Sequence, residues 1–160
     1  MFRGYRLTIF AVLSASLLFG LGSYTLYVGE GLSYFSTRAE ACANCHIMRP
    51  HYDGWVKSSH HAVATCSDCH LPQTFFAKYL AKAENGWHHS RAFTLNDFAE
   101  PIRIKPKNAA ALEQNCRRCH NDLTAHMVSS PNGQLACVHC HSQVGHPTPA
   151  GTGAPLARKD

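Results

Sequence analysis

The chain has 160 residues and a formal net charge of +5 at pH 7 with histidine counted as neutral. This length allows one domain of about 100 to 200 residues and excludes a second domain with a hydrophobic core of its own. Two residue types stand out, because the sequence holds 8 cysteines and 12 histidines. Their positions along the chain bear most directly on function.

The N-terminal segment predicts a membrane helix. Residues 7–28 carry no charge, and a helix of about 20 residues spans the hydrocarbon core of a bilayer. Arg3 and Arg6 precede the apolar run and Glu30 follows it, which places the N-terminus in the cytoplasm. A cleaved signal peptide is the alternative, but the run is too long for one and lacks a small-residue cleavage site. We expect residues 1–28 to be a single-pass anchor.

Four C-x-x-C-H motifs follow, beginning at residues 42, 66, 116 and 137. This is the attachment motif of c-type haem, in which two thiols form thioethers and the histidine is aimed at the iron. Zinc sites or a disulfide framework would leave the histidine after every pair unexplained. We therefore predict four covalently bound haem c groups. They use every cysteine in the chain, namely Cys42, Cys45, Cys66, Cys69, Cys116, Cys119, Cys137 and Cys140.

The haems change the meaning of the positive charge. Each ferric haem brings about one net negative charge, so the net charge of the oxidised holoprotein is about +1. The basic sequence is therefore weak evidence for an anionic partner, and we expect no nucleic acid among the partners.

After the second motif, the pattern predicts a helix over residues 75–89 that starts after Pro72-Gln73-Thr74. It would suit a membrane interface, with lysine stems reaching towards water, or else lie on the surface with a solvated basic face. The pattern does not separate these two interpretations. The polar stripe of this helix consists of Lys78, Lys82, Asn85 and His89.

The C-terminal third reads as short elements between loops. Residues 93–107 are predicted to be an extended connection, and Asn108 is expected to cap a helix over residues 109–115. A Pro131-Asn132-Gly133 turn leads to the fourth motif. The tail over residues 147–160 is rich in Pro, Gly and Ala and is expected to be disordered.

The haems themselves are expected to form the core. Four macrocycles in about 130 extramembrane residues leave too little chain for an ordinary side-chain core. The predicted fold class is mainly α with much irregular structure. It comprises one N-terminal transmembrane helix and a small haem-packed multihaem cytochrome c domain over residues 29–146.

The axial ligands can be partly assigned from the motifs. His70, His120 and His141 complete the last three motifs, whereas in the first motif the thioether of Met48 could compete with His46 for the iron. An iron held in that way could keep a vacant far side, where chemistry is possible. The candidates for the second ligands are His51, His60, His61, His88, His89, His126, His139 and His146.

Two of these candidates stand five residues from a motif. His61 precedes Cys66 and His146 follows His141 at that spacing, so each would have to wrap round the edge of its own haem. A neighbouring haem is the expected target of both, and His60 could replace His61.

The apolar N-terminal helix, the Cys42-Ala43-Asn44-Cys45-His46-Ile47-Met48 motif, the three further motifs and Lys82-Ala83-Glu84-Asn85-Gly86 resemble the NapC/NirT family of quinol dehydrogenases. The resemblance covers residues 5–146, and the short length is similar to that of the small subunit of cytochrome c nitrite reductase. It implies that Met48 rather than His46 binds the first iron and that Lys82 faces a quinol pocket. It also implies that His61 and His146 bind the third and second irons.

One residue departs from the family pattern. His89 stands where relatives can have an aspartate near the open side of the first haem. Either the imidazole takes over the role of proton acceptor, or His89 ligates that iron and closes it.

The resemblance implies a membrane-bound quinol dehydrogenase of the bacterial inner membrane, with its N-terminus in the cytoplasm and its haem domain in the periplasm. We expect it to oxidise menaquinol from the membrane quinol pool at the first haem, with Lys82 and His89 as catalytic residues. The electrons would pass to a periplasmic multihaem reductase, the pentahaem cytochrome c nitrite reductase catalytic subunit. Two alternatives stay open: a donor to another periplasmic reductase, and a tetrahaem relay that does not bind quinol.

The fourth haem is left short of a second ligand within the chain. His139 lies inside its own motif on the proximal side, and His126 reaches the iron only if the following segment folds back. We expect this haem to lie at the surface that meets the reductase and to take its sixth ligand from that partner.

Overall fold

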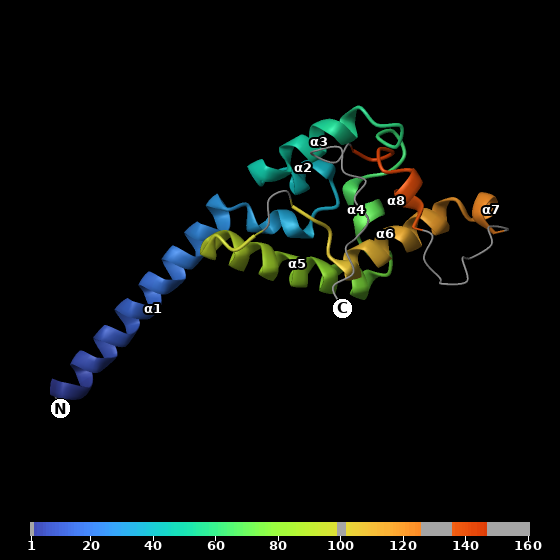
Figure 1. Cartoon of the computed structure of the whole chain (residues 1–160). Helices are drawn as coiled ribbons and strands as arrows, with labels where there is room; N and C mark the ends of the chain where they lie inside the picture. The colour runs from blue at the N-terminus through green and yellow to red at the C-terminus, as the bar shows by residue number, and fades with distance from the viewer. Residues whose placement is uncertain (1, 99–101, 126–135, 147–160) are drawn as a thin grey trace. The chain divides into compact units, whose positions relative to one another are not determined.

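The computed structural model describes residues 2–98, 102–125 and 136–146. It divides into two compact units, Met1–Ser36 and Thr37–Asp160. The described residues form helices and no strand (Figure 1), so the mainly α fold class with an apolar N-terminal helix is confirmed. His126, the Pro131-Asn132-Gly133 turn and the tail over residues 147–160 lie outside the described residues.

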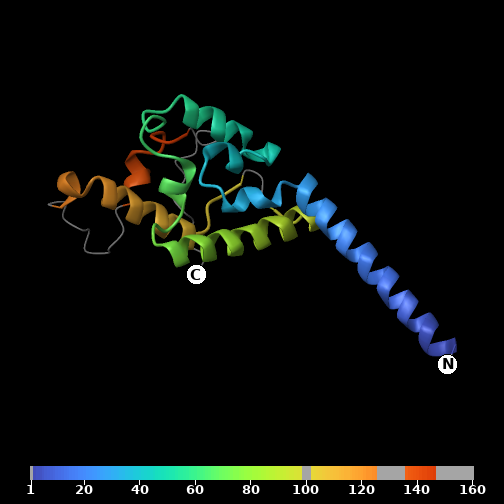
Figure 2. The same ribbon diagram turned by 180° about the vertical axis from the view of Figure 1, so that it is seen from behind.

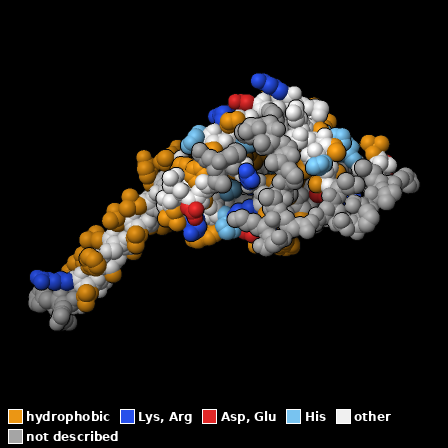
Figure 3. Space-filling model, in the orientation of Figure 1, with side chains coloured by type: hydrophobic (Ala, Val, Ile, Leu, Met, Phe, Trp, Pro, Cys, Tyr) orange, Lys and Arg blue, Asp and Glu red, His pale blue; other side chains and the backbone are white. Residues whose placement is uncertain are grey.

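The first unit is built on α1 (Phe2–Val28). Within the described chain, its segment Gly4–Val28 is the one helix long and apolar enough to cross a membrane. Apolar side chains are exposed along it (Figure 3). The helix gives way to a 3-10 turn, η1 (Gly31–Phe35), through Glu30, whose φ of 48° is left-handed. At Gly31 a Cβ would lie 2.2 Å from Leu26 Cδ1, so a larger residue there would require the Leu26 side chain to move.

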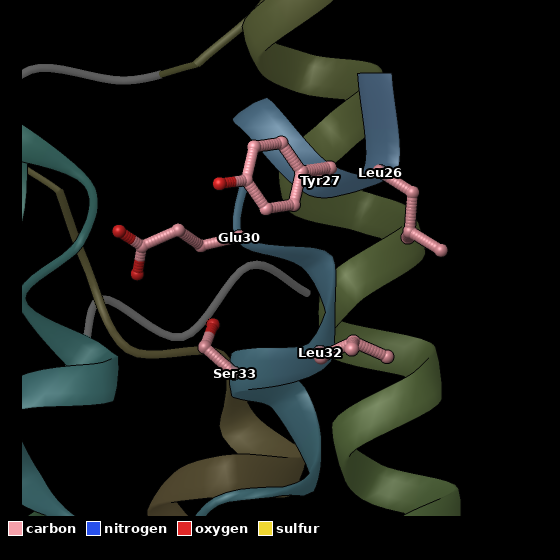
Figure 4. Close-up of a pocket in the computed structure, with 5 residues that line it drawn as sticks. All are labelled: Leu26, Tyr27, Glu30, Leu32 and Ser33. Atoms are coloured by element: carbon pink, nitrogen blue, oxygen red, sulfur yellow. The ribbon is translucent and has the colours of Figure 1, made fainter. Parts of the chain in front are cut away.

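This change of direction leaves a recess of about 330 Å³ at the end of α1. The leucine side chains and the polar side chains lie at different sides of the close-up (Figure 4). The recess is lined by Leu26, Tyr27, Glu30, Leu32 and Ser33.

The second unit contains two long helices and several short ones. The long helices are α5 (Phe75–Leu95) and α6 (Pro106–Cys119). The views from both sides show α4 and α8 beside α6 (Figures 1 and 2). The short elements are α2 (Ala39–Cys42), η2 (His46–Met48), α3 (Arg49–Val56), α4 (Cys66–His70), α7 (Asn121–Thr124) and α8 (Cys137–Cys140).

The ends of the long helices differ from the prediction. α5 continues to Leu95 and ends where Asn96 takes a left-handed conformation, with φ of 52°. α6 begins at Pro106 after Lys105, in the position where proline is favoured because it has no N–H to satisfy. The predicted Asn108 cap is therefore wrong, and its amide instead donates to Asn85 Oδ1 at 3.0 Å.

α6 is tied to three other elements by polar side chains. Near its start, Lys107 pairs with Glu84 of α5. Near its end, Asn115 donates to the carbonyls of Cys69 and Leu71, at 2.9 and 2.8 Å. Glu113 reaches Cys137 at the start of α8. This helix therefore sets the spacing between the last three motifs.

The side-chain core is very small. Among the described residues the buried apolar side chains are Ala39, Ala43 and Ala81, and the buried polar ones are Ser67, Lys82 and Asn115. Such a core removes little apolar surface from water compared with an ordinary domain of this length. The side chains therefore supply only a small part of the packing that stabilises the fold, and other groups must supply most of it.

Candidate functional site

Each C-x-x-C-H motif lies in a helix or at the end of one. α4 is the second motif, α8 holds the cysteines of the fourth, and the cysteines of the third stand in the last turn of α6. A spacing of three residues in a helix puts both sulfurs on one side. The first motif differs, since α2 ends at Cys42 and η2 begins at His46. None of the eight cysteines is in a disulfide.

The second motif is held at both ends of its helix. At the start, Asp68 Oδ2 accepts hydrogen bonds from the N–H and the hydroxyl of Thr65, at 2.8 and 2.7 Å. At the end, Gln73 Nε2 donates to the Leu71 carbonyl at 2.7 Å. A helix of 5 residues needs such caps because most of its backbone groups lack partners within it.

The sulfurs of successive motifs lie near one another. The Cys66 thiol, hydrogen-bonded to Cys42, lowers the pKa of Cys42. Burial, and then the charges of Asp68 and Cys119, raises the pKa of Cys69.

The third and fourth motifs are also close. Burial, then Glu113 and the Cys116 thiol, raises the pKa of Cys137 to about 11. The attachment points therefore neighbour one another in the order first, second, third and fourth along the chain.

Two pairs of histidines stand at the spacing that an iron between them requires. Two imidazole nitrogens that each bind an iron at about 2 Å bring the ring centroids about 6 Å apart. His70 and His146 have centroids 6.1 Å apart, and His60 and His120 have centroids 6.0 Å apart. The residues therefore fit haem at the second and third motifs.

The resemblance implied that His146 binds the second iron, and the ring of His146 lies beside that of His70. Its Nδ1 lies 3.3 Å from His51 Nδ1. A hydrogen bond to one ring nitrogen commonly orients the other towards a metal. His51 would therefore orient His146 if that ring binds the iron.

At the third motif, the ring that lies opposite His120 is that of His60, whereas the sequence favoured His61. His60 is partly buried, and its Nδ1 contacts the Val144 carbonyl at 3.1 Å. His61 is exposed, with its ring edge on Trp55 at 4.8 Å between centroids. Trp55 donates to the Ala64 carbonyl at 2.9 Å, and this bond closes the loop with His61 on its outer side.

Lys82 is placed beside the first motif. Its side chain is buried, with 9% of the residue exposed, and its ammonium lies 5.7 Å from the centre of the Tyr79 ring. Desolvation lowers the pKa of Lys82; the Cys42 sulfur opposes this, and the Lys78 charge lowers it further. The interaction with Cys42 shows that the amine stands near the first attachment point.

The predicted axial residues of the first motif have different environments. Met48 is partly buried in η2, whereas His46 is exposed with its ring 6.4 Å from that of Phe93. The fourth motif also exposes its histidine, His141.

Three residues of the polar stripe of α5 are buried or partly buried, namely Lys78, Lys82 and Asn85. Burial opposes the lowering of the pKa of the Asp68 carboxyl, which is brought about by the Thr65 hydrogen bonds and then by the charges of Lys78 and Arg118. Asn85 bonds to α6. His89 is exposed. Partial desolvation, then the charges of Lys105 and His88, lowers its pKa, so the imidazole is neutral near pH 7 and can accept a proton.

Sequence reasoning missed Glu113 and Asn115, which hold the motifs in place, and considered His51 only as a candidate ligand. His51, Glu113 and Asn115 act through contacts with residues 95, 24 and 44–46 positions away in the chain. No local pattern marks them.

Comparison with known proteins identifies the family. The model of the NapC/NirT cytochrome c family, N-terminal region, matches residues 4–151. The chain is 37% identical over 139 residues to the cytochrome c-type protein NrfH of Wolinella succinogenes, covering 79% of this chain and 78% of that one. It is 33% identical over 119 residues to the cytochrome c nitrite reductase subunit NrfH of Nitratidesulfovibrio vulgaris, covering 74% and 73%.

A solved structure agrees with these relatives. The crystal structure of the cytochrome c nitrite reductase NrfHA complex bound to the HQNO inhibitor matches with a TM-score of 0.63 and 26% identity, covering 93% of this chain and 99% of that one. The sequence matches, the covalent haem motifs and the fold lead to one conclusion: the chain belongs to the NapC/NirT cytochrome c family, whose members carry covalently bound haem c.

Proposed function

We propose that this chain is the membrane-anchored, quinol-oxidising subunit of a respiratory nitrite reductase complex. It takes electrons from menaquinol and delivers them through four haem c groups to a periplasmic catalytic subunit. α1 anchors it in the bacterial inner membrane, with the N-terminus in the cytoplasm. The relatives named for nitrite reductase, at 37% and 33% identity, favour this acceptor over another periplasmic reductase.

The observation that carries the proposal is the buried amine of Lys82 beside the first motif. A buried lysine usually has a functional or structural role, because desolvation of its charge is costly. At this place its N–H groups could hold a quinol oxygen next to the first haem. A relay that only exchanged electrons with other proteins would have no need of such a group.

The apolar side of α5 supports access from the lipid phase. Four large side chains of this helix are 68–86% exposed, which is unusual for a soluble surface and common where a helix lies at a membrane interface. They are Phe75, Phe76, Leu80 and Trp87. Lys82 thus belongs to a helix with an exposed apolar surface suited to contact with lipid.

The haems supply one-electron chemistry, and the chain supplies binding and proton transfer. Quinol oxidation releases two protons along with its two electrons. We assign Lys82 to orient the substrate by donating a hydrogen bond, and neutral His89 to accept a proton at a ring nitrogen. Met48, rather than His46, is proposed as the protein ligand of the first iron, since it is the more buried of the two.

The remaining ligands follow from the histidine pairs. His146 is proposed for the second iron with His70, and His60 for the third with His120. For the fourth, His141 is exposed, and we propose that the reductase supplies the sixth ligand.

Substitution of Lys82 by methionine tests the proposal. In membranes that contain the complex, we expect Lys82→Met to slow nitrite reduction driven by a menaquinol analogue at least tenfold. Full reduction of the haems by dithionite should remain unchanged. Lys57→Met, an exposed lysine in the same unit, is the matched control and should retain its activity. Quinol-driven rates that survive Lys82→Met would favour the relay instead.

A further inference from the structure

Glu113 joins the third and fourth motifs through a single carboxylate. Its Oε2 accepts a hydrogen bond from the Cys137 backbone N–H at 2.7 Å, and its Oε1 lies 3.1 Å from Cys137 Sγ. The same Oε1 accepts a hydrogen bond from Arg117 Nε at 2.9 Å. The Glu113 side chain is 22% exposed and that of Arg117 is 46% exposed.

The two charges of this ion pair are held by different motifs, although each also acts on the other one: burial and then Glu113 raise the pKa of Cys116, and Arg117 opposes the rise in the pKa of Cys137. Arg117 lies between Cys116 and Cys119, inside the third motif, while the carboxylate rests on Cys137, the first residue of the fourth. In the haem-bound chain Cys137 carries a thioether rather than a thiol, so its sulfur no longer donates. The backbone hydrogen bond remains and keeps the carboxylate beside that attachment point.

We propose that the Glu113–Arg117 pair positions the fourth haem against the third and sets the difference between their reduction potentials. A negative charge near a redox group favours its oxidised form, because reduction adds a further negative charge, and a positive charge does the reverse. Glu113 therefore lowers the potential of the fourth haem, and Arg117 raises that of the third. The inference rests on the proposed function only in that it requires haems at both motifs.

This arrangement makes transfer from the third haem to the fourth an uphill step, because an electron is favoured on the third. The fourth haem, once reduced, is then a more strongly reducing donor to an external acceptor. Partial burial of the carboxylate protects the effect from salt, since screening acts mainly on exposed charges.

Opposite substitutions in the purified holoprotein test the idea. Glu113→Gln keeps the acceptor for the Cys137 N–H and removes the negative charge. Spectroscopic redox titration with chemical mediators should show one midpoint potential rising, by up to tenfold in the reduction equilibrium, which is about 59 mV for one electron. Arg117→Gln should lower a midpoint potential.

The two signs separate electrostatics from structural damage. Shifts in the same direction in both variants, or no upward shift in Glu113→Gln, would overturn the proposal. If Glu113→Gln fails to load four haems by intact mass, Arg117→Gln alone decides, and an unchanged or raised set of potentials there counts against it. Because the mediators replace quinol, the result is independent of quinol oxidation.

Discussion

Asn115 fixes the third motif against the second, and its replacement by alanine should destabilise the haem domain. The residue is 6% exposed, and its Nδ2 donates to the Cys69 and Leu71 carbonyls at 2.9 and 2.8 Å. Alanine removes both donors. The second motif then loses its tether to α6.

The expected decrease in the free energy of unfolding depends on whether each carbonyl keeps another hydrogen-bond donor. Leu71 keeps the bond from Gln73 Nε2 at 2.7 Å, so its share is that of an ordinary hydrogen bond, about 0.5–1.5 kcal/mol. For Cys69 the loss of the Asn115 donor adds a desolvation cost of about 1–3 kcal/mol. Together they give a destabilisation of about 1.5–4.5 kcal/mol.

Unfolding of the holoprotein in guanidinium chloride, followed by the haem absorption band, measures this quantity. Asn108→Ala is a matched control on the same helix, because it removes one side-chain hydrogen bond, to Asn85, at a partly buried position. We expect it to cost under about 1 kcal/mol. Equal losses in the two variants, or a loss below 1 kcal/mol in Asn115→Ala, would show that the tether contributes little.

Two further predictions concern the ligands and the proton acceptor. His60→Ala should convert one low-spin haem to high-spin in the absorption spectrum while His61→Ala leaves all haems as they were, and the opposite pattern would restore His61 as the ligand. Because desolvation, Lys105 and His88 lower the pKa of His89, its neutral form persists below the ordinary histidine value. Quinol oxidation should therefore fall only as the pH drops through that lowered value. His89→Ala should reduce the rate and abolish this acid limb, whereas a high-spin change in His89→Ala would identify it as an iron ligand.

The motif class, the membrane anchor and most of α5 could be predicted from the sequence, because cysteine spacing, an uncharged apolar run and helical periodicity are local patterns. The ends of the helices were harder to predict from the sequence. Asn108 is a favoured cap residue, yet Pro106 starts α6 and the amide is used on α5 instead. A left-handed Asn96 extends α5 beyond the predicted end.

The choice between His60 and His61 depended on distant contacts. Neighbouring residues in a loop point to different sides, and which of them faces inward is decided here by Trp55 and Val144. Likewise, nothing local to Glu113 or Asn115 indicates the elements that they hold. Short sequence patterns determine which residues can bind haem, whereas long-range polar contacts determine how the haems are spaced.

The three buried alanines of the described chain have a consequence for biosynthesis. A polypeptide with so little apolar burial has no means to offset the entropy of ordering its backbone. The translocated chain must therefore remain an unfolded client until haem is attached, and a copy that misses one haem lacks part of its interior. Such incompletely loaded copies expose unfolded chain and are therefore open to proteolysis.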